Sequence, residues 1–152
     1  MPEVSVVLPV FNGARTISRA VRSILDQTLR KIELIVLDDG STDETVAVIR
    51  KLRDPRLKLI QCAHRGVAAT ANAATKLAAS PFIARMDADD FAYPLRLETQ
   101  LELLHEQNLD VIGCQVCISN ETGRVVRSMR RYERWINEET AHGEQISALR
   151  FV

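Results

Sequence analysis

The sequence predicts an α/β fold in which a mostly parallel, Rossmann-like central sheet lies between two layers of helices. Segments typical of a strand and of a helix alternate four times between residues 3 and 107, and this order requires right-handed crossovers between parallel strands. The first two strand segments are almost continuously apolar, as expected for strands covered on both faces. A chain of 152 residues is long enough for one such core but too short for two ordinary domains.

The first part of the chain supplies two strands and two helices. Residues 3–10 and 32–37 are short β-branched runs, which predict buried strands. Between them, five apolar residues share one helical stripe: Ile17, Ala20, Val21, Ile24 and Leu25. Ser41 and Glu44 fit a capping box, in which Ser41 caps a helix running to about Leu52 and Glu44 reaches back to it.

The remaining elements follow in the same order. Residue 54 precedes a proline and ends the second helix. Asn108 is the expected stop of the fourth helix. We expect strands at 57–62, 82–86 and 111–118, helices at 66–79 and 94–107, a turn at 120–123, a return strand from 125, and further helices in the last twenty residues. The predicted domain is a single unit over 1–152, with a core at about 3–128 and a polar segment at 129–152.

The composition of the chain excludes some classes of function. Twenty basic residues balance twenty acidic ones, which argues against a general nucleic-acid binder. There is no apolar run of about eighteen residues that could cross a membrane, and the chain starts without a signal-peptide pattern. The three cysteines are few and odd in number, as in a reducing cytosol. We therefore expect a cytoplasmic protein, whose full-length form could lie at the inner face of the membrane.

Cys114 and Cys117 form a C-x-x-C pair. On the predicted strand 111–118, side chains three positions apart point to opposite faces. No second cysteine pair is available to complete a zinc site. The sequence therefore favours two structural cysteines over a metal or redox site.

Polar or glycine-containing clusters follow each of the four early strands. In a parallel sheet the carboxyl ends of the strands lie on one edge, where ligands bind in α/β proteins. One cluster alone would indicate only a turn, but four on one edge predict a shared crevice. The clusters are 11–13, 38–40, 64–66 and 87–90.

Asp87 and Asp89 are the candidate metal ligands. Alternate residues of an extended segment share a face, so both carboxylates can converge on one ligand. Such hard oxygen ligands suit Mg²⁺ or Mn²⁺ near phosphates, where the cation stabilises a diphosphate leaving group. The alternative is an acidic helix N-terminus, with Asp89 or Asp90 as the cap.

Other residues of the clusters suit a nucleotide. The carboxylate of Asp39 could accept hydrogen bonds from a base or a ribose, and Phe11 offers an apolar face to a base. Arg65 could pair with a phosphate, and Gly66 would let backbone N–H groups approach it. The alternatives are a plain strand-to-helix loop for Asp39, a core position for Phe11 and a solvated side chain for Arg65.

Six segments, in this order and spacing, resemble family 2 glycosyltransferases over about residues 3–128. They are VSVVLPVFN at 4–12, SILDQT at 23–28, ELIVLDDGSTD at 33–43, HRGVAATAN at 64–72, ARMDADD at 84–90 and PLRLE at 94–98. The resemblance implies a GT-A fold and an inverting transfer of a sugar from a nucleotide-diphosphate donor, with UDP expected. The acceptor is unknown, and a cell-surface polysaccharide or glycolipid is expected.

The resemblance also assigns roles to residues. By position, Pro9 and Phe11 border the nucleoside, and Asn12 belongs to the same donor-binding motif. Asp39 matches the carboxylate that holds the base. The two aspartates of the D-x-D match a ribose contact and a metal ligand: Asp87 lies near the ribose, and Asp89 binds the Mg²⁺ or Mn²⁺ that bridges the diphosphate.

Two departures from the family pattern concern the helix at 66–79. Ala71 stands where many members have Arg or Leu, and this can remove a donor contact. Ala74 stands in place of Gly, which is a mild change in a helix.

A third departure concerns the general base. The family's acidic base motif has no match between residues 120 and 152, where polar helix surfaces explain the glutamates. No catalytic residue is therefore identified in this chain, and the resemblance implies that the general base lies beyond Val152. We expect a C-terminally truncated domain that lacks the acceptor and base region, is inactive alone, and can form a homodimer through an exposed edge.

Three other functions compete with the enzyme. A non-catalytic nucleotide-sugar-binding module of the same fold is the main alternative. A nucleotidyltransferase would need a glycine- and basic-rich phosphate loop after the first strand, and residues 9–13 do not resemble one. A phosphoacceptor receiver domain would need a lysine after a later strand, which the sequence does not offer.

Overall fold

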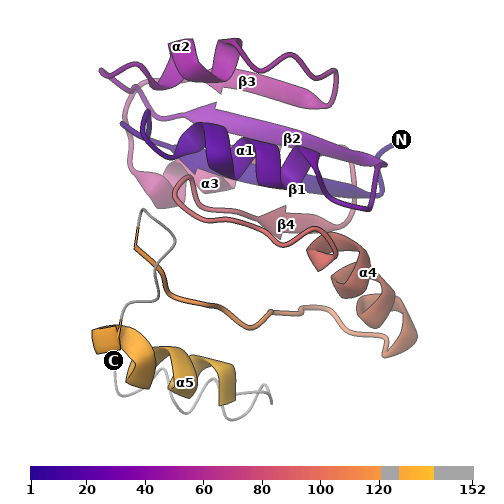
Figure 1. The fold of residues 1–152 in the computed structure, drawn as a ribbon. Helices are drawn as coiled ribbons and strands as arrows, with labels where there is room; N and C mark the ends of the chain where they lie inside the picture. Colours follow the sequence, from indigo (N-terminus) through magenta and orange to yellow (C-terminus); the bar gives the residue numbers. More distant parts are fainter. Residues whose placement is uncertain (121–126, 139–152) are drawn as a thin grey trace. The chain divides into compact units, whose positions relative to one another are not determined.

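The computed structural model describes residues 1–120 and 127–138. Four strands form one parallel sheet in the order β3-β2-β1-β4. Their bounds are β1 (Val4–Val10), β2 (Ile32–Asp38), β3 (Leu57–Gln61) and β4 (Ile83–Arg85). The predicted parallel sheet is confirmed, and the order of its strands (Figure 1) brings the ends of β1 and β2 to its centre.

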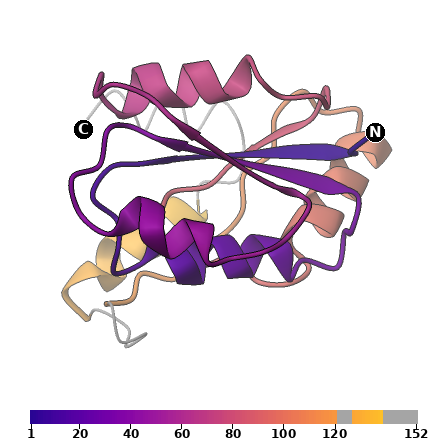
Figure 2. The same cartoon turned by 90° about the horizontal axis from the view of Figure 1, so that it is seen from above.

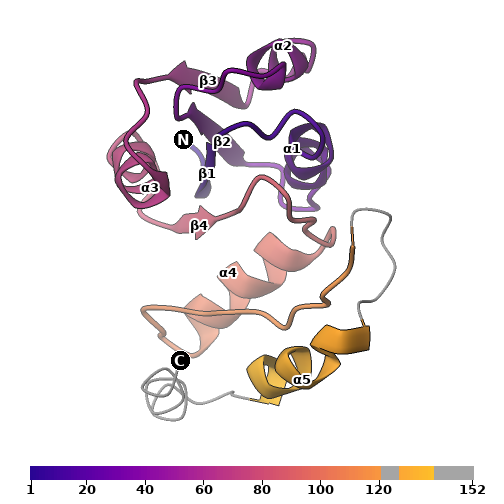
Figure 3. The same cartoon turned by 90° about the vertical axis from the view of Figure 1, so that its left-hand side faces the viewer.

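Helices cover both faces of the sheet. Helices α1 (Ile17–Leu25) and α2 (Thr45–Arg50) lie on one face and α3 (Val67–Thr75) on the other, as Figures 2 and 3 show from two directions. Helix α4 (Arg96–Glu106) follows β4 and packs Leu97 into the core on the α1 side. The predicted three-layer α/β/α arrangement is confirmed.

The alternation of side chains along β1 and β2 builds a core on each face. Every residue of both strands is buried, which explains their almost continuous hydrophobicity. Leu8 and Val36 pack toward α1 and α2, whereas Val7 and Ile35 pack toward Ala74 of α3. The two central strands are therefore a rigid platform for the loops that follow them.

The predicted capping box at the start of α2 is wrong. Helix α2 begins at Thr45 with Glu44 at its N-cap, and Glu44 makes no side-chain cap hydrogen bond. The Ser41 hydroxyl accepts the Asn12 N–H instead (2.8 Å), and the carboxylate of Asp43 accepts the Thr45 N–H (3.0 Å). The Ser41 hydroxyl therefore bonds a residue 29 positions away in the sequence instead of capping α2.

Of two further predicted helix ends, one is wrong and the other is confirmed. Helix α3 ends at Thr75 and not at residue 79, because the Ala79 N–H donates to the carboxylate of Glu33 (2.6 Å). The expected stop of α4 is confirmed, since Asn108 adopts a left-handed backbone with φ of 52°, a conformation that Asn tolerates at helix ends.

The chain divides into two compact units, residues 1–108 and 109–152. In the second unit the structure describes a 3₁₀ turn, η1 (Arg127–Met129), and helix α5 (Arg130–Glu138). The expected strand at 111–118 is wrong: these residues are not paired in the sheet. The side chain of Asn137 bonds both the N–H and the C=O of Val116 (2.8 Å each), so a helix side chain replaces the strand partner.

Because residues 111–118 form no strand, Cys114 and Cys117 do not lie on opposite faces of one, and both are exposed free thiols. The predicted return strand from 125, and all but the first residue of the predicted turn, lie outside the described residues. The predicted domain extent stays a prediction. In the part of the chain that the structure describes, no helix is long and apolar enough to cross a membrane.

The expectation for the general base concerns the end of the chain. Val152 lies outside the described residues, which stop at residue 138. The expected position of the base beyond Val152 therefore stays a prediction, as does the truncation of the domain.

Candidate functional site

The loops that follow β1, β2 and β4 meet at the carboxyl edge of the sheet. The Asn12 side-chain oxygen accepts the Thr42 N–H (2.8 Å), which ties the first loop to the second. A Cβ atom added to Gly13 would lie 3.7 Å from the Cβ of Ala88, so the loop after β4 lies against the loop after β1. The predicted convergence of strand-end clusters holds for these three loops, and the contacts of Asp39 and Phe11 bring residues 64–66 to the same place.

Asp39 connects the loop after β2 to the loop after β3. Its carboxylate is buried and accepts hydrogen bonds from the Arg65 N–H (2.9 Å), the Gly66 N–H (2.8 Å) and the Thr70 hydroxyl (2.6 Å). Burial raises the pKa of Asp39, but the donors from Thr70, Arg65 and Gly66 and the nearby His64 outweigh it, so the pKa lies below its ordinary value. Asp39 is therefore a fixed anion at neutral pH.

A pair of aromatic rings lies above this carboxylate. The ring of Phe11, 48% exposed, stands 4.2 Å from the ring of His64 at an interplanar angle of 33°. Nδ1 of His64 is 3.0 Å from a carboxylate oxygen of Asp39. The gap between Phe11 and Asp39 therefore accommodates a planar ring that carries a nitrogen.

The acidic segment after β4, residues 86–92, presents its carboxylates to solvent. Asp87 pairs with Arg85 (2.9 Å), and Asp90 N–H closes a turn onto the Asp87 carbonyl (3.3 Å). The Asp89 carboxylate is exposed and has no hydrogen-bond or ion-pair partner in the part of the chain that the structure describes. Partial desolvation and the charges of Asp89 and Asp87 raise the pKa of Asp90.

These acids fit a divalent cation. Mutually repelling carboxylates are the donors that Mg²⁺ and Mn²⁺ prefer, and a bound cation relieves the repulsion. Among the described residues no group of three or more acidic, histidine or cysteine side chains already forms a complete metal site. A cation here would take its remaining ligands from a bound molecule, as Mg²⁺ does with substrate phosphates.

The other predicted residues are placed as follows. Pro9 is buried in β1 beside Leu37 of β2. Arg65 has an exposed side chain. Gly66, with φ of 90°, caps α3. The N–H groups of both Arg65 and Gly66 donate to Asp39, and the predicted phosphate contact of the Arg65 side chain stays a prediction.

Sequence reasoning gave no role to Thr70, Arg19, Ser23 or Gln27, although all four support the crevice. Thr70 bonds Asp39, and the other three contact the chain that follows β4. One chemical feature of the sequence could have indicated the role of Gln27. Gln27 follows the apolar residues Ile24 and Leu25, and an amide buried beside such residues needs hydrogen-bond partners.

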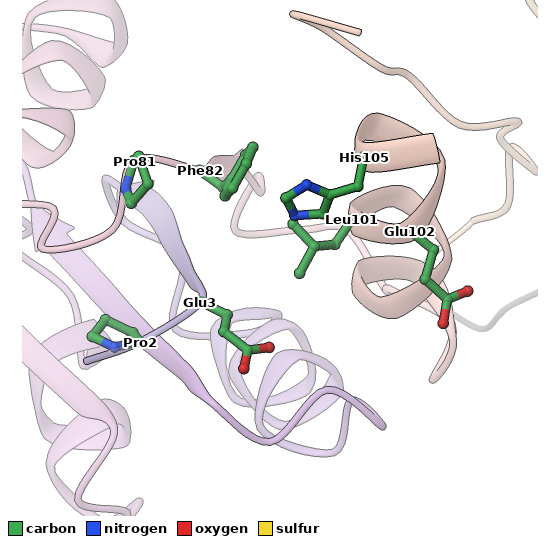
Figure 4. A pocket seen from close by; sticks show the side chains of 7 residues that line it. All are labelled: Pro2, Glu3, Pro81, Phe82, Leu101, Glu102 and His105. Carbon is green, nitrogen blue, oxygen red and sulfur yellow. The ribbon is translucent and has the colours of Figure 1, made fainter. Parts of the chain in front are cut away.

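A hollow of about 420 Å³ lies elsewhere in the first unit (Figure 4). Its lining includes Glu3 next to the amino end of β1 and Phe82 before β4, with Leu101 and His105 from α4. Glu3 and Phe82 precede β1 and β4, whereas the acidic segment follows the carboxyl end of β4. The hollow is therefore no part of the crevice.

Comparison with known proteins identifies the family. The model of "Glycosyl transferase family 2" matches residues 5–149. The chondroitin synthase of Pasteurella multocida (strain Pm70) is 38% identical over 112 residues, which are 72% of this chain and 12% of that protein. An uncharacterized glycosyltransferase of Escherichia coli (strain K12), YibD, is 30% identical over 131 residues, 84% of this chain and 38% of its own.

Solved structures share the fold. S. aureus TarS 1-349 in complex with UDP is 25% identical with a TM-score of 0.66, covering 77% of this chain and 39% of TarS 1-349. The mannosyltransferase PcManGT from Pyrobaculum calidifontis, in complex with GDP-Man and Mn²⁺, is 28% identical with a TM-score of 0.62, covering 78% of this chain and 36% of the enzyme. The chain spans less than half the length of each of these four proteins. The predicted GT-A fold is confirmed, and the chain belongs to glycosyl transferase family 2.

Proposed function

We propose that this chain binds the nucleotide-sugar donor of an inverting, metal-dependent glycosyltransferase, with a uridine diphosphate sugar as the donor. The nucleoside lies at Pro9, Phe11 and Asn12, and the base is held by Asp39. The ribose lies near Asp87, and Asp89 would hold the Mg²⁺ or Mn²⁺ ion. Arg65, whose side chain is exposed, and Gly66 lie in the loop that faces the phosphates.

The observation that carries this proposal is the position of His64. Its ring stacks on Phe11 at 4.2 Å, and its Nδ1 lies 3.0 Å from the Asp39 carboxylate. A uracil base offers the same features, a planar ring and an N3–H donor. Because the His64 side chain is 56% exposed, it can swing out, and the base then takes its place between Phe11 and Asp39.

The metal supplies one function when bound: it neutralises the negative charge of the leaving diphosphate. The chain's own residues hold the donor so that an acceptor hydroxyl attacks the anomeric carbon from the face opposite the diphosphate, which inverts the configuration. The donors of solved relatives differ, since TarS 1-349 was solved with UDP-GlcNAc and PcManGT with GDP-Man.

The first prediction concerns the base. In calorimetric titration with Mn²⁺, CDP is expected to bind about tenfold or more weakly than UDP, because N3 of cytosine carries no hydrogen for the Asp39 carboxylate and a hydrogen bond to a charged group is lost. Both nucleotides carry the same diphosphate, so CDP is the matched control. Equal affinities would contradict the role of Asp39 in holding the base.

The second prediction concerns the metal. Mn²⁺ is expected to tighten UDP binding to this chain about tenfold or more, and Asp89→Ala is expected to abolish that gain, because an exposed carboxylate ligand is removed. Glu102→Ala, which removes an exposed acid on α4, should leave the gain intact. If Mn²⁺ has no effect on the unaltered chain, the metal-dependent proposal is wrong.

A non-catalytic nucleotide-sugar-binding module of the same fold would give identical results in both titrations. Transfer measured with the full-length protein separates the two functions, because only the enzyme releases UDP in the presence of an acceptor. Release that disappears with Asp89→Ala supports the enzyme. Tight donor binding without release in the full-length protein supports the module.

A further inference from the structure

The acidic segment continues beyond the pairing of its strand. The registered pairing of β4 with β1 ends at Arg85 opposite Val7, and the Met86 N–H makes the next bond, to the Val7 carbonyl (3.1 Å). From Asp87 onward the segment no longer runs as a paired strand. Side chains from outside the sheet must therefore fix its shape.

Three residues spaced four positions apart in the sequence fix the shape of the acidic segment. Arg19 and Ser23 lie one turn apart on α1, and Gln27 lies just beyond its end, so the three follow one face. The Arg19 guanidinium donates to the Asp89 carbonyl (2.9 Å). The Ser23 hydroxyl accepts the Ala92 N–H (3.1 Å).

Gln27 is the strongest of these anchors. It is fully buried, and its amide nitrogen donates to the carbonyls of Ser23 (2.9 Å) and Tyr93 (2.8 Å). Its amide oxygen accepts the Leu97 N–H at the start of α4 (3.0 Å). A buried amide with both ends bonded fixes the path of the chain between the acidic segment and α4.

We propose that Arg19, Ser23 and Gln27 form a positioning stripe that holds the acidic segment in the shape required to bind a divalent cation and a diphosphate. The hydrogen bonds from the stripe to the segment go to backbone atoms of Asp89 and Ala92, and the carboxylates of Asp87 and Asp89 stay exposed. These three are therefore positioning residues that act through the acidic segment. The inference rests on the proposed function for its ligand, but the shape of the segment can be measured without one.

Hydrogen exchange of the unliganded chain tests the positioning. Gln27→Met keeps the length of the side chain but removes both ends of the amide, and amide exchange across residues 89–97 is expected to rise about tenfold or more. Ser23→Ala should produce the same change at Ala92. The control is Glu33→Ala, which weakens the opposite face of the sheet, toward α3. In that variant residues 89–97 should change no more than β2 does.

Binding separates positioning from general stability. In Gln27→Met the Mn²⁺ concentration needed for tight UDP binding is expected to rise about tenfold, while metal-free UDP binding is unchanged. Arg19→Ala should show the same loss and Arg19→Lys should recover it, because lysine keeps a donor for the Asp89 carbonyl. Exchange that rises equally in β2 and in residues 89–97 would overturn the proposal. If the unaltered chain does not respond to Mn²⁺, the proposed function fails, and the exchange result still decides whether the stripe positions the segment.

Discussion

Asp39→Asn is expected to lower the free energy of unfolding by about 2–4 kcal/mol at pH 7. The buried carboxylate accepts two backbone N–H groups and the Thr70 hydroxyl from the loop after β3 and from α3. An asparagine offers one oxygen and turns an NH₂ group toward those donors. Urea denaturation followed by circular dichroism measures the change.

Asp38→Asn is the matched control for this change. Asp38 is the neighbouring residue and is equally buried. One of its carboxylate oxygens accepts only a long bond from the Ser41 N–H (3.3 Å), and the other has no partner among the described residues. The same substitution should therefore cost far less there. If the two variants lose the same stability, the bonds to the loop are not what makes Asp39 important.

The central sheet could be predicted from the sequence because its signals are local. The residues of β1 and β2 are mostly apolar on both faces of the sheet. The apolar residues from Ile17 to Leu25 have a spacing that fits only a helix covering one face of that sheet. The expected strand at 111–118 failed for a different reason. Strand propensity produces a strand only where a neighbour pairs with it, and the Val116 backbone is bonded by the Asn137 side chain instead.

The sequence could predict which loops form the site, but not the hydrogen bonds that hold these loops in place. Parallel strands must place their carboxyl ends on one edge, so the clusters after β1, β2 and β4 had to lie close together. The bonds that shape the loops join residues far apart in sequence, such as Asp39 to Thr70 and Gln27 to Leu97, which are 31 and 70 positions apart. No local sequence pattern encodes such pairs. The predicted Ser41 cap was wrong for the same reason, because Ser41 bonds Asn12, which is 29 positions away.

Glu33→Ala is expected to destabilise the chain by about 2–4 kcal/mol at pH 7, and by less at pH 3. The buried carboxylate accepts the Ser5 hydroxyl (2.5 Å), the Ala79 N–H (2.6 Å) and the Lys58 ammonium (2.6 Å). It thereby joins β1, β2, β3 and the end of the α3 segment. Urea denaturation at both pH values measures the difference between the variant and the unaltered chain.

The pH dependence follows from the direction of the pKa shift. Burial raises the pKa of Glu33, but the hydrogen bonds from Lys58, Ser5 and Ala79 outweigh it and leave the pKa below its ordinary value. The carboxylate therefore stabilises the fold above the unfolded pKa, and this contribution is lost as the pH falls through the folded pKa. Lys58→Ala is the control: its side chain is 55% exposed, and the variant keeps the Glu33 carboxylate with its bonds from Ser5 and Ala79, so it is expected to lose less stability than Glu33→Ala. An equal loss for Glu33→Ala at pH 7 and pH 3 would show that packing, and not the anion, connects these elements.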